Sequence, residues 1–262
     1  MLVDVTNDIL IATFNRPDKL NAMSEQLMQI LEEAVYRFRD TRELRVMLIK
    51  SKGRYFSAGA DMKQGGAGKE PSGKTYGSTI RESHRRLAMR RVWDEMERIE
   101  KPIVVAHHAR CVGGSLEMSL SCDFRLAAVG ASYAFPEAKF GVLPATNGVS
   151  RLVRLVGPHW AKLMIMANVP INAEEARLAG LVHKVYPDET FEQDVMTFCR
   201  HVAEQNPEFV GTAKVTIDLA AELGVHEAAS LERLANSSLM LSPDYQDLVA
   251  AHVANIGKGK GG

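Results

Sequence analysis

Short apolar segments of strand length alternate with helical patterns through the first two thirds of the chain, and this alternation constrains the fold most. Residues 9–14 and 46–49 are apolar runs that predict buried strands. Between them, an N-cap at Ser24 opens a helix towards residue 39 with its apolar side chains on one face. The pattern resumes with a helix at 81–98, a strand at 102–106, a helix opened by Gly113 and Gly114, and a strand at 124–128. This order predicts an α/β protein with a largely parallel, covered sheet.

From about residue 190 onward the pattern is helical. Helices are predicted at 191–205, 209–223, 225–239 and 244–255. The apolar faces of the second and third of these helices have no partner in a lone tail, which favours burial against neighbouring subunits. The sequence therefore predicts a core domain of residues 1–190 and a helical oligomerisation region of residues 191–262.

The composition argues against several classes of protein. Acidic and basic residues balance at 32 each, so no broad basic surface is available for nucleic acid. The three cysteines form no CxxC pair, which suits a reducing compartment and argues against a disulfide framework or a zinc site. No segment approaches the roughly 20 apolar residues that span a bilayer, and the N-terminus has no secretory pattern. We therefore expect a cytoplasmic protein with no membrane or nucleic-acid partner.

Two clusters of small residues follow predicted strands. Ala58, Gly59 and Ala60 come after the strand at 46–49, and Gly113 and Gly114 come after the strand at 102–106. Small residues let a ligand approach the backbone closely, and unpaired N–H groups can face a developing negative charge. Taken alone, each cluster is more typical of a tight turn than of a binding site.

Two glutamates lie close to these clusters or follow them. Glu117 stands in a run of apolar and small residues, where a carboxylate is costly to bury, although it could also face solvent from an amphipathic turn. Glu137 follows Pro136, and a carboxylate in the first turn of a helix is an ordinary structural feature. Each glutamate is therefore ambiguous in isolation.

Taken together, these segments resemble the crotonase (enoyl-CoA hydratase/isomerase) superfamily. Four motifs occur in the order and at the spacing of that family: Asn15-Arg16-Pro17 with Leu20-Asn21-Ala22, Ser57-Ala58-Gly59-Ala60-Asp61, Gly113-Gly114 through Glu117 to Cys122-Asp123, and Pro136-Glu137 with Gly141 and Pro144. The resemblance covers residues 9 to 190 well and the helical tail loosely. It implies a crotonase-like spiral of ββα units followed by a helical trimerisation region.

The resemblance also implies a mechanism. The backbone N–H groups of Ala60 and Gly114 would form an oxyanion hole for a thioester carbonyl. Glu117 would take a proton from water as it attacks C3 of an enoyl-CoA, and Glu137 would deliver a proton to C2. The implied enzyme is an enoyl-CoA hydratase, a carbon–oxygen lyase.

Ligand contacts follow from the same resemblance. Coenzyme A belongs to the substrate, so no permanently bound cofactor or metal is implied, and the expected assembly is a homotrimer or a dimer of trimers. Thr146 and Asn147 lie in the loop that faces the acyl group in relatives and are candidates to read a polar substituent. The expected coenzyme A contacts are Lys19, Leu20, Ala22, Ala58, Asp61 and Met62.

Departures from the family pattern leave the substrate open. Ser115 and Leu116 stand where a third glycine is common, and His108-Ala109 replaces the family's usual Asn-Gly pair, with His107 just before it. Such histidines could line the pocket, although hydrogen-bonded structural histidines are the more common case. An isomerase, a hydrolase or a C–C lyase remains an alternative, as does a catalytically idle CoA-ester or RNA-binding relative. Fatty-acid β-oxidation and the breakdown of aromatic or alicyclic acids are both compatible with the sequence.

Overall fold

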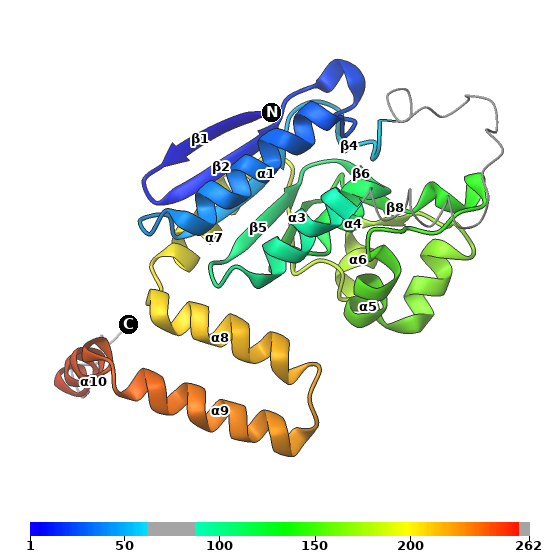
Figure 1. The fold of residues 1–262 in the computed structure, drawn as a ribbon. Coiled ribbons are helices and arrows are strands. Elements are labelled where there is room, and N and C mark those ends of the chain that lie inside the picture. Colours follow the sequence, from blue (N-terminus) through cyan, green and yellow to red (C-terminus); the bar gives the residue numbers. More distant parts are fainter. Residues whose placement is uncertain (62–86, 257–262) are drawn as a thin grey trace. The chain divides into compact units, whose positions relative to one another are not determined.

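The computed structural model describes residues 1–61 and 87–256 (Figure 1). By its internal contacts the chain divides into two compact units, Met1–Glu204 and Gln205–Gly262. Among the described residues, no helix is both long and apolar enough to cross a membrane.

A six-stranded sheet forms the centre of the first unit. Its order is β1 (Leu2–Thr6), β2 (Ile9–Phe14), β3 (Val46–Ser51), β5 (Ile103–His107), β7 (Phe124–Ala128) and β10 (Lys184–Tyr186). β1 and β2 are antiparallel, and every later pair in this sheet is parallel. The predicted α/β architecture with a largely parallel sheet is therefore confirmed.

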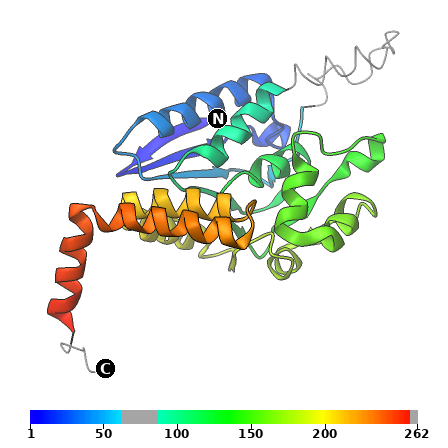
Figure 2. The ribbon, with the colours of Figure 1, turned by 60° about the horizontal axis from the view of Figure 1, so that its bottom comes forward.

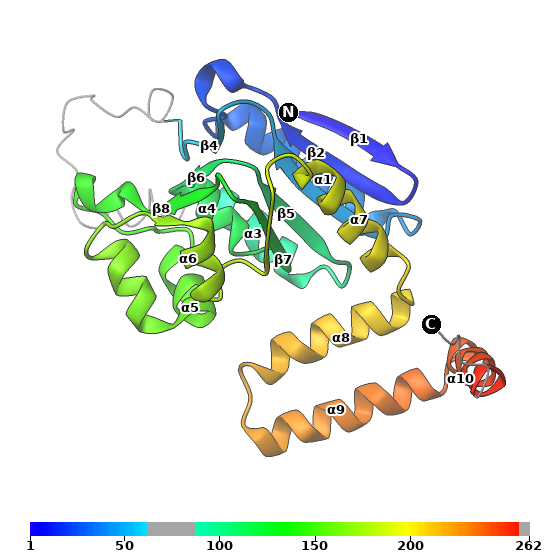
Figure 3. The same cartoon turned by 180° about the vertical axis from the view of Figure 1, so that it is seen from behind.

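Both faces of this sheet are covered. Along β3, Met47 and Ile49 point into one hydrophobic core and Val46 and Leu48 into another, as the two-residue period of a strand requires. The first core is closed by α1 (Glu25–Asp40) and α3 (Leu87–Arg98), and the opposite face by α7 (Phe191–Ala203) (Figure 3). Burial on both faces explains why the strands read as continuous apolar runs.

Helix α1 begins where the sequence predicts. Ser24 is its N-cap, and the Ser24 Oγ accepts a hydrogen bond from the Leu27 backbone nitrogen at 3.3 Å. This side chain satisfies one of the unpaired N–H groups of the first turn.

A second sheet has four strands, and the first three of them each follow a strand of the large sheet in the chain. Its order is β4 (Tyr55–Ser57), β6 (Arg110–Val112), β8 (Ser132–Ala134) and β9 (Ile171–Asn172). The strand pairs β3 and β4, β5 and β6, and β7 and β8 each place one strand in the large sheet and the next in the small one. A helical segment follows each pair, so the ββα unit repeats, as predicted.

The remaining helical segments of the first unit connect these strands. They are η1 (Pro17–Lys19), α4 (Gly114–Ser119), η2 (Pro136–Phe140), α5 (Gly148–Ile165) and α6 (Ala173–Leu178). Helix α5 is interrupted at Gly157, where φ is 71° and Pro158 follows.

Up to residue 256, where the described part of the chain ends, the second unit contains three helices: α8 (Pro207–Ala220), α9 (Val225–Met240) and α10 (Pro243–Asn255). Helices α8 and α9 form an antiparallel pair, and α10 leaves it in a different direction (Figure 2). The N-cap residue of α8, Asn206, donates a side-chain hydrogen bond to Asp244 at 2.7 Å. Large apolar side chains are exposed on all three helices, among them Ile217, Val225, Leu234, Leu248 and Val253.

The compact units differ from the predicted domains at one boundary. We expected the core domain to end at residue 190, whereas contacts divide the chain after Glu204. Helix α7 belongs to the first unit because Phe191, Val195 and Cys199 are buried against the large sheet.

Candidate active site

Three parallel strands of the small sheet end at one edge, and each is followed by a predicted site residue. β4, β6 and β8 are neighbours, and their chain continuations carry Ala60, Gly114 and Glu137. The carboxyl ends of parallel strands meet at the same edge, where α/β proteins commonly bind ligands. A Cβ atom on Gly113 would lie 2.8 Å from Glu137 Oε1, and one on Gly114 would lie 3.8 Å from the Ala60 nitrogen. The structure thus brings these positions together.

The Ala60 backbone N–H has no hydrogen-bond acceptor among residues 1–61 and 87–256. Ala60 bridges Met23 in a parallel arrangement. The bonds of this bridge run from the Met23 nitrogen to the Gly59 oxygen at 2.8 Å and from the Asp61 nitrogen to the Met23 oxygen at 3.3 Å. Both bonds bypass Ala60, so its N–H is available to a ligand.

The Gly114 N–H is likewise without an acceptor in the described part of the chain. Gly114 is the first residue of α4, where an N–H has no intrahelical partner. Gly59 has φ +84°, and a Cβ atom there would lie 3.4 Å from the Gly114 nitrogen and 2.7 Å from the Val112 oxygen. Glycine at position 59 therefore lets the two segments that carry the free N–H groups approach closely.

Glu117 is a buried carboxylate with defined donors. It lies in α4 and is only 5% exposed. Its Oε2 accepts hydrogen bonds from the Thr146 backbone nitrogen and from the Thr146 hydroxyl, each at 2.7 Å. Burial raises the pKa of Glu117, while hydrogen bonds from the Thr146 side chain and from the Thr146 and Gly148 backbone, and the charge of Arg151, oppose that rise. The alternative in which Glu117 faces solvent is wrong.

Glu137 has a different environment. It lies in the first turn of η2, directly after Pro136. Its Oε2 is buried and has no hydrogen-bond partner among the described residues. Burial, with a smaller contribution from the charge of Glu117, raises the pKa of Glu137 from 4.5 to about 7. With a pKa of about 7, Glu137 is a carboxyl group that is partly protonated near neutral pH.

The two glutamates interact electrostatically but differ in hydrogen bonding. Thr146 solvates Glu117, whereas burial leaves one oxygen of Glu137 unpartnered. Opposed environments of this kind separate the pKa values of a carboxyl pair, so that one member serves as a base and the other as an acid. This arrangement can take a proton at one position and deliver one at another.

The segments expected to bind coenzyme A are joined by backbone hydrogen bonds. The Ala58 nitrogen donates to the Leu20 oxygen at 2.9 Å, and Arg16 lies 3.6 Å from the Asp61 carboxylate. The structure thus brings together Leu20, Ala22, Ala58 and Asp61, and it places Lys19 as an exposed residue of η1 beside them. Met62 lies outside the described residues.

Asn21 fixes the turn that carries this segment. It is fully buried and has φ +53°. Its side-chain oxygen accepts from the Arg16 backbone nitrogen at 2.8 Å, and its amide donates to the carbonyls of Lys52 and Tyr55 at 2.7 and 3.0 Å. An asparagine tolerates the left-handed conformation and also satisfies buried backbone groups here.

The loop before α5 is tied to α3, a connection that sequence reasoning missed. The indole nitrogen of Trp93 donates to the Thr146 hydroxyl at 3.2 Å, and the Asn147 side chain donates to Asp94 at 3.3 Å. Arg151, with its side chain 8% exposed, donates to Asp94 at 2.7 Å, to Glu97 at 2.6 Å and to the Thr146 carbonyl at 3.1 Å. No local signal relates residues more than fifty positions apart, so these contacts became visible only in the folded chain.

His107 and His108, where the sequence departs from the family pattern, both have hydrogen-bond partners within the protein. His107 is fully buried, contacts the Ser119 hydroxyl at 2.9 Å and contacts the Tyr133 hydroxyl at 3.2 Å through its Nδ1. Burial lowers the pKa of His107 to about 3, so it is neutral. The Nε2 of His108 contacts the Gly53 carbonyl at 2.5 Å. Both histidines are hydrogen-bonded within the fold.

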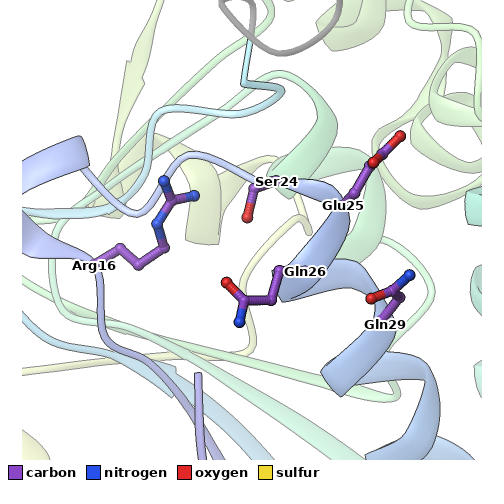
Figure 4. Close-up of a pocket in the computed structure, with 5 residues that line it drawn as sticks. All are labelled: Arg16, Ser24, Glu25, Gln26 and Gln29. Atoms are coloured by element: carbon purple, nitrogen blue, oxygen red, sulfur yellow. The ribbon is translucent and has the colours of Figure 1, made fainter.

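A polar surface pocket of about 470 Å³ opens near the first turn of α1 (Figure 4). It is lined by Arg16, Ser24, Glu25, Gln26 and Gln29, and none of these is among the residues predicted to bind or react. Over residues 1–61 and 87–256, no three His, Cys, Asp or Glu side chains are grouped as metal ligands would be.

Comparison with known proteins identifies the family. The sequence pattern of the enoyl-CoA hydratase/isomerase family matches residues 4–251. The chain belongs to this family. It is 30% identical over 223 residues to a probable mitochondrial enoyl-CoA hydratase of Dictyostelium discoideum, with 85% of this chain and 76% of that protein covered. It is 27% identical over 252 residues to 2,3-dehydroadipyl-CoA hydratase of Escherichia coli K12, with 96% and 94% covered.

Solved structures agree with this assignment to the enoyl-CoA hydratase/isomerase family. An enoyl-CoA hydratase subunit of Geobacillus kaustophilus superposes with a TM-score of 0.87 at 29% identity, covering 97% of this chain and 95% of the other. Enoyl-CoA hydratase of Bacillus anthracis gives the same TM-score at 27% identity, covering 97% and 96%. The predicted crotonase-like fold is confirmed.

Proposed function

We propose that this chain is an enoyl-CoA hydratase, which adds water across the 2,3 double bond of an enoyl-CoA thioester. The observation that supports this most strongly is the unequal pair of glutamates beside two free backbone amides. Hydration needs a base for water and an acid for C2. Hydrogen bonds to Glu117 favour its charged form, as a base requires, and burial of Glu137 favours its protonated form, as an acid requires.

The proposed reaction begins with polarisation of the thioester carbonyl and continues with addition at C3 and C2. The N–H groups of Ala60 and Gly114 hold the thioester oxygen as it gains negative charge, a stabilisation of roughly 2.7–4 kcal/mol per donor. Glu117 removes a proton from water while the water oxygen attacks C3. Glu137 gives its proton to C2, and the enolate collapses to the 3-hydroxyacyl thioester. One proton enters and one leaves the carboxyl pair, so a proton exchange with solvent restores the starting state.

Coenzyme A is proposed to lie along the joined segments that contain Leu20, Ala22, Ala58 and Asp61, with Lys19 and Met62 at their ends. In this placement the thioester carbonyl would lie at the backbone amides of Ala60 and Gly114. The acyl group would then point toward the two glutamates. Relatives named as hydratases of short-chain and dehydroadipyl thioesters support a CoA thioester as the substrate class.

We also propose that the helices of the second unit mediate assembly into a trimer or a dimer of trimers. Exposed apolar side chains on α8, α9 and α10 favour burial against other subunits. Light scattering of the purified chain tests this, and a monomer at micromolar concentration would contradict it.

The test of the catalytic proposal is hydration of crotonyl-CoA, followed by loss of the absorbance of the conjugated thioester. Glu117→Gln and Glu137→Gln are each expected to lower kcat by at least about 100-fold, the lower range for a positioned acid or base. Glu189→Gln, an exposed turn residue far along the chain, is the matched control and should leave turnover unchanged.

Other outcomes discriminate among the alternatives. Unchanged turnover in both site variants would disprove the two-glutamate mechanism even though the family assignment stands. Binding of CoA esters without any hydration would instead favour an isomerase, a hydrolase or a C–C lyase, which would share the oxyanion hole. Binding of CoA esters without conversion of any of them would favour a catalytically idle CoA-ester relative, and a chain that neither binds nor converts CoA esters would favour an RNA-binding relative.

A further inference from the structure

The Thr146 hydroxyl has a fixed direction. It accepts a hydrogen bond from the Trp93 indole nitrogen at 3.2 Å and donates to Glu117 Oε2 at 2.7 Å. An indole N–H can only donate, so the lone pair of the hydroxyl is occupied and its own proton points to the carboxylate. Trp93 is fully buried in the main core, which holds this donor in place.

The same oxygen of Glu117 receives a second donor from the same residue. The Thr146 backbone nitrogen donates to Oε2 at 2.7 Å. Two short N–H and O–H bonds to one carboxylate oxygen stabilise its charged form and orient the other oxygen away from Thr146. The Gly148 backbone also donates to this carboxylate. The other oxygen is the one we expect to contact a water molecule.

The loop that carries Thr146 is anchored at several points. The Thr146 carbonyl accepts a hydrogen bond from Arg151, which is paired with Asp94 and Glu97 of α3. The neighbouring Asn147 has φ +66° and donates to Asp94 as well. Thr146 therefore has little freedom to turn its hydroxyl toward an acyl group, the role that the sequence had indicated for it.

We propose that Thr146, oriented by Trp93, is a positioning residue that makes Glu117 the base of the glutamate pair. The proposal rests on the hydratase function proposed above and deepens it, because it assigns the division of roles to a side chain outside the pair. Thr146 acts through Glu117 and needs no contact with the substrate.

The test compares Thr146→Val, which keeps the shape and the backbone donor but removes the hydroxyl, with Thr146→Ser, which keeps both donors. The pH dependence of kcat/KM is expected to shift on its acidic side to higher pH by about one unit in Thr146→Val, an amount typical of one charge-assisted hydrogen bond. At a fixed pH on the acidic side of the profile, kcat/KM of Thr146→Val should therefore be about tenfold lower than that of the unchanged protein. Thr146→Ser should keep the profile of the unchanged protein.

Two further variants complete the comparison. Trp93→Phe removes the indole donor and is expected to shift the profile in the same direction by a smaller amount. Thr197→Val is the matched control, because within residues 1–61 and 87–256 the Thr197 hydroxyl bonds only to the Gln193 carbonyl of its own helix, at 2.9 Å. It should change neither the profile nor the rate. A uniform loss of rate in Thr146→Val with an unshifted profile, or equal effects of valine and serine, would overturn the proposal.

A titration that needs no turnover separates this proposal from the hydratase assignment. In ligand-free protein with ¹³C-labelled glutamate carboxyl groups, the Glu117 resonance is assigned by its loss in Glu117→Gln. Its midpoint should move to higher pH in Thr146→Val and stay in place in Thr146→Ser. An unmoved midpoint refutes the role of Thr146, whereas absence of crotonyl-CoA hydration in the unchanged protein refutes the hydratase function alone.

Discussion

Thr146 donates two hydrogen bonds to a single oxygen of Glu117, one from its backbone nitrogen and one from its hydroxyl, both 2.7 Å long. Glu137 has no such support, since its buried Oε2 lacks a hydrogen-bond partner among the described residues. The burial that raises both pKa values is thus offset at Glu117 by local donors, while at Glu137 only its own backbone opposes the rise. The difference between two chemically identical side chains comes from their surroundings.

The first prediction concerns the basic side of the pH–rate profile. Glu137 must be protonated to act as an acid, and its pKa is raised to about 7. As pH rises through that value the acid is lost, so kcat/KM for crotonyl-CoA should fall about tenfold per pH unit above it. Stopped-flow or steady-state rates between pH 5 and 9 measure this. A rate that stays constant to pH 9 would count against Glu137 as the acid.

The second prediction concerns stability. The folded pKa of Glu137 lies above its unfolded value, so proton binding favours the folded state below about pH 4.5, and this contribution is lost as pH rises to about 7. Relative to Glu137→Gln, the unchanged protein should lose about 1–2 kcal/mol of stability across that interval, an amount reduced by partial exposure of the side chain to solvent. Urea denaturation at pH 5 and pH 8 measures it. The Glu189→Gln control keeps Glu137 and should lose the same stability between these pH values as the unchanged protein.

The third prediction concerns the glycine that contacts Glu137. Gly113 has φ +55°, and a Cβ atom there would lie 2.8 Å from Glu137 Oε1. At φ +55° and ψ −127° the backbone of Gly113 lies in a region nearly restricted to glycine, so Gly113→Ala should cost about 1–3 kcal/mol in backbone strain and, in addition, displace the carboxyl group. We expect a loss of crotonyl-CoA hydration of at least about tenfold, because a small displacement of a catalytic group is enough to lower the rate.

Gly141→Ala is the matched control for this change. Gly141 has φ +65°, but no atom lies within 4 Å of the position that a Cβ atom would take. Gly141 lies in the left-handed α region (φ +65°, ψ +28°), so Gly141→Ala should cost about 1–2 kcal/mol for its backbone and retain turnover. Equal rates in the two variants would show that the contact with Glu137 is unimportant.

The fourth prediction concerns Arg151. Its nearly buried guanidinium pairs with Asp94 and Glu97, and Arg151→Met would remove the cation that both share. Asp94 would keep only Arg90, at 3.6 Å, and the Asn147 amide among the described residues. Removing one member of such a cluster should cost about 2–4 kcal/mol, less than for a fully buried cluster because Asp94 and Glu97 are partly exposed. Chemical denaturation checks this.

Arg177→Met serves as the comparison for Arg151. Arg177 pairs with Glu174 on the surface of α6, and surface ion pairs contribute little to stability. We expect almost no change in Tm for this variant. If both arginine variants lost the same stability, the anchoring of the Thr146 loop through Arg151 would not be supported.

The sequence by itself determined several of the strands and helices in the first unit. The strand at 9–14, the Ser24 cap and the glycines that open α4 depend on side-chain periodicity and on local hydrogen bonds, which act between residues close in the chain. The motif order also predicted that Ala60, Gly114, Glu117 and Glu137 belong to one site. Local patterns of this kind survive into the fold because few tertiary contacts compete with them.

Only the tertiary structure decided the environments of these residues. Burial of Glu117, its two bonds from Thr146 and the contact of Trp93 with that hydroxyl join segments separated by 29 and 53 positions. The placement of α7 against the large sheet, which moved the boundary of the first unit to Glu204, is of the same kind. Such contacts depend on the order of strands and on the packing of helices across them, and no short-range pattern in the chain encodes either.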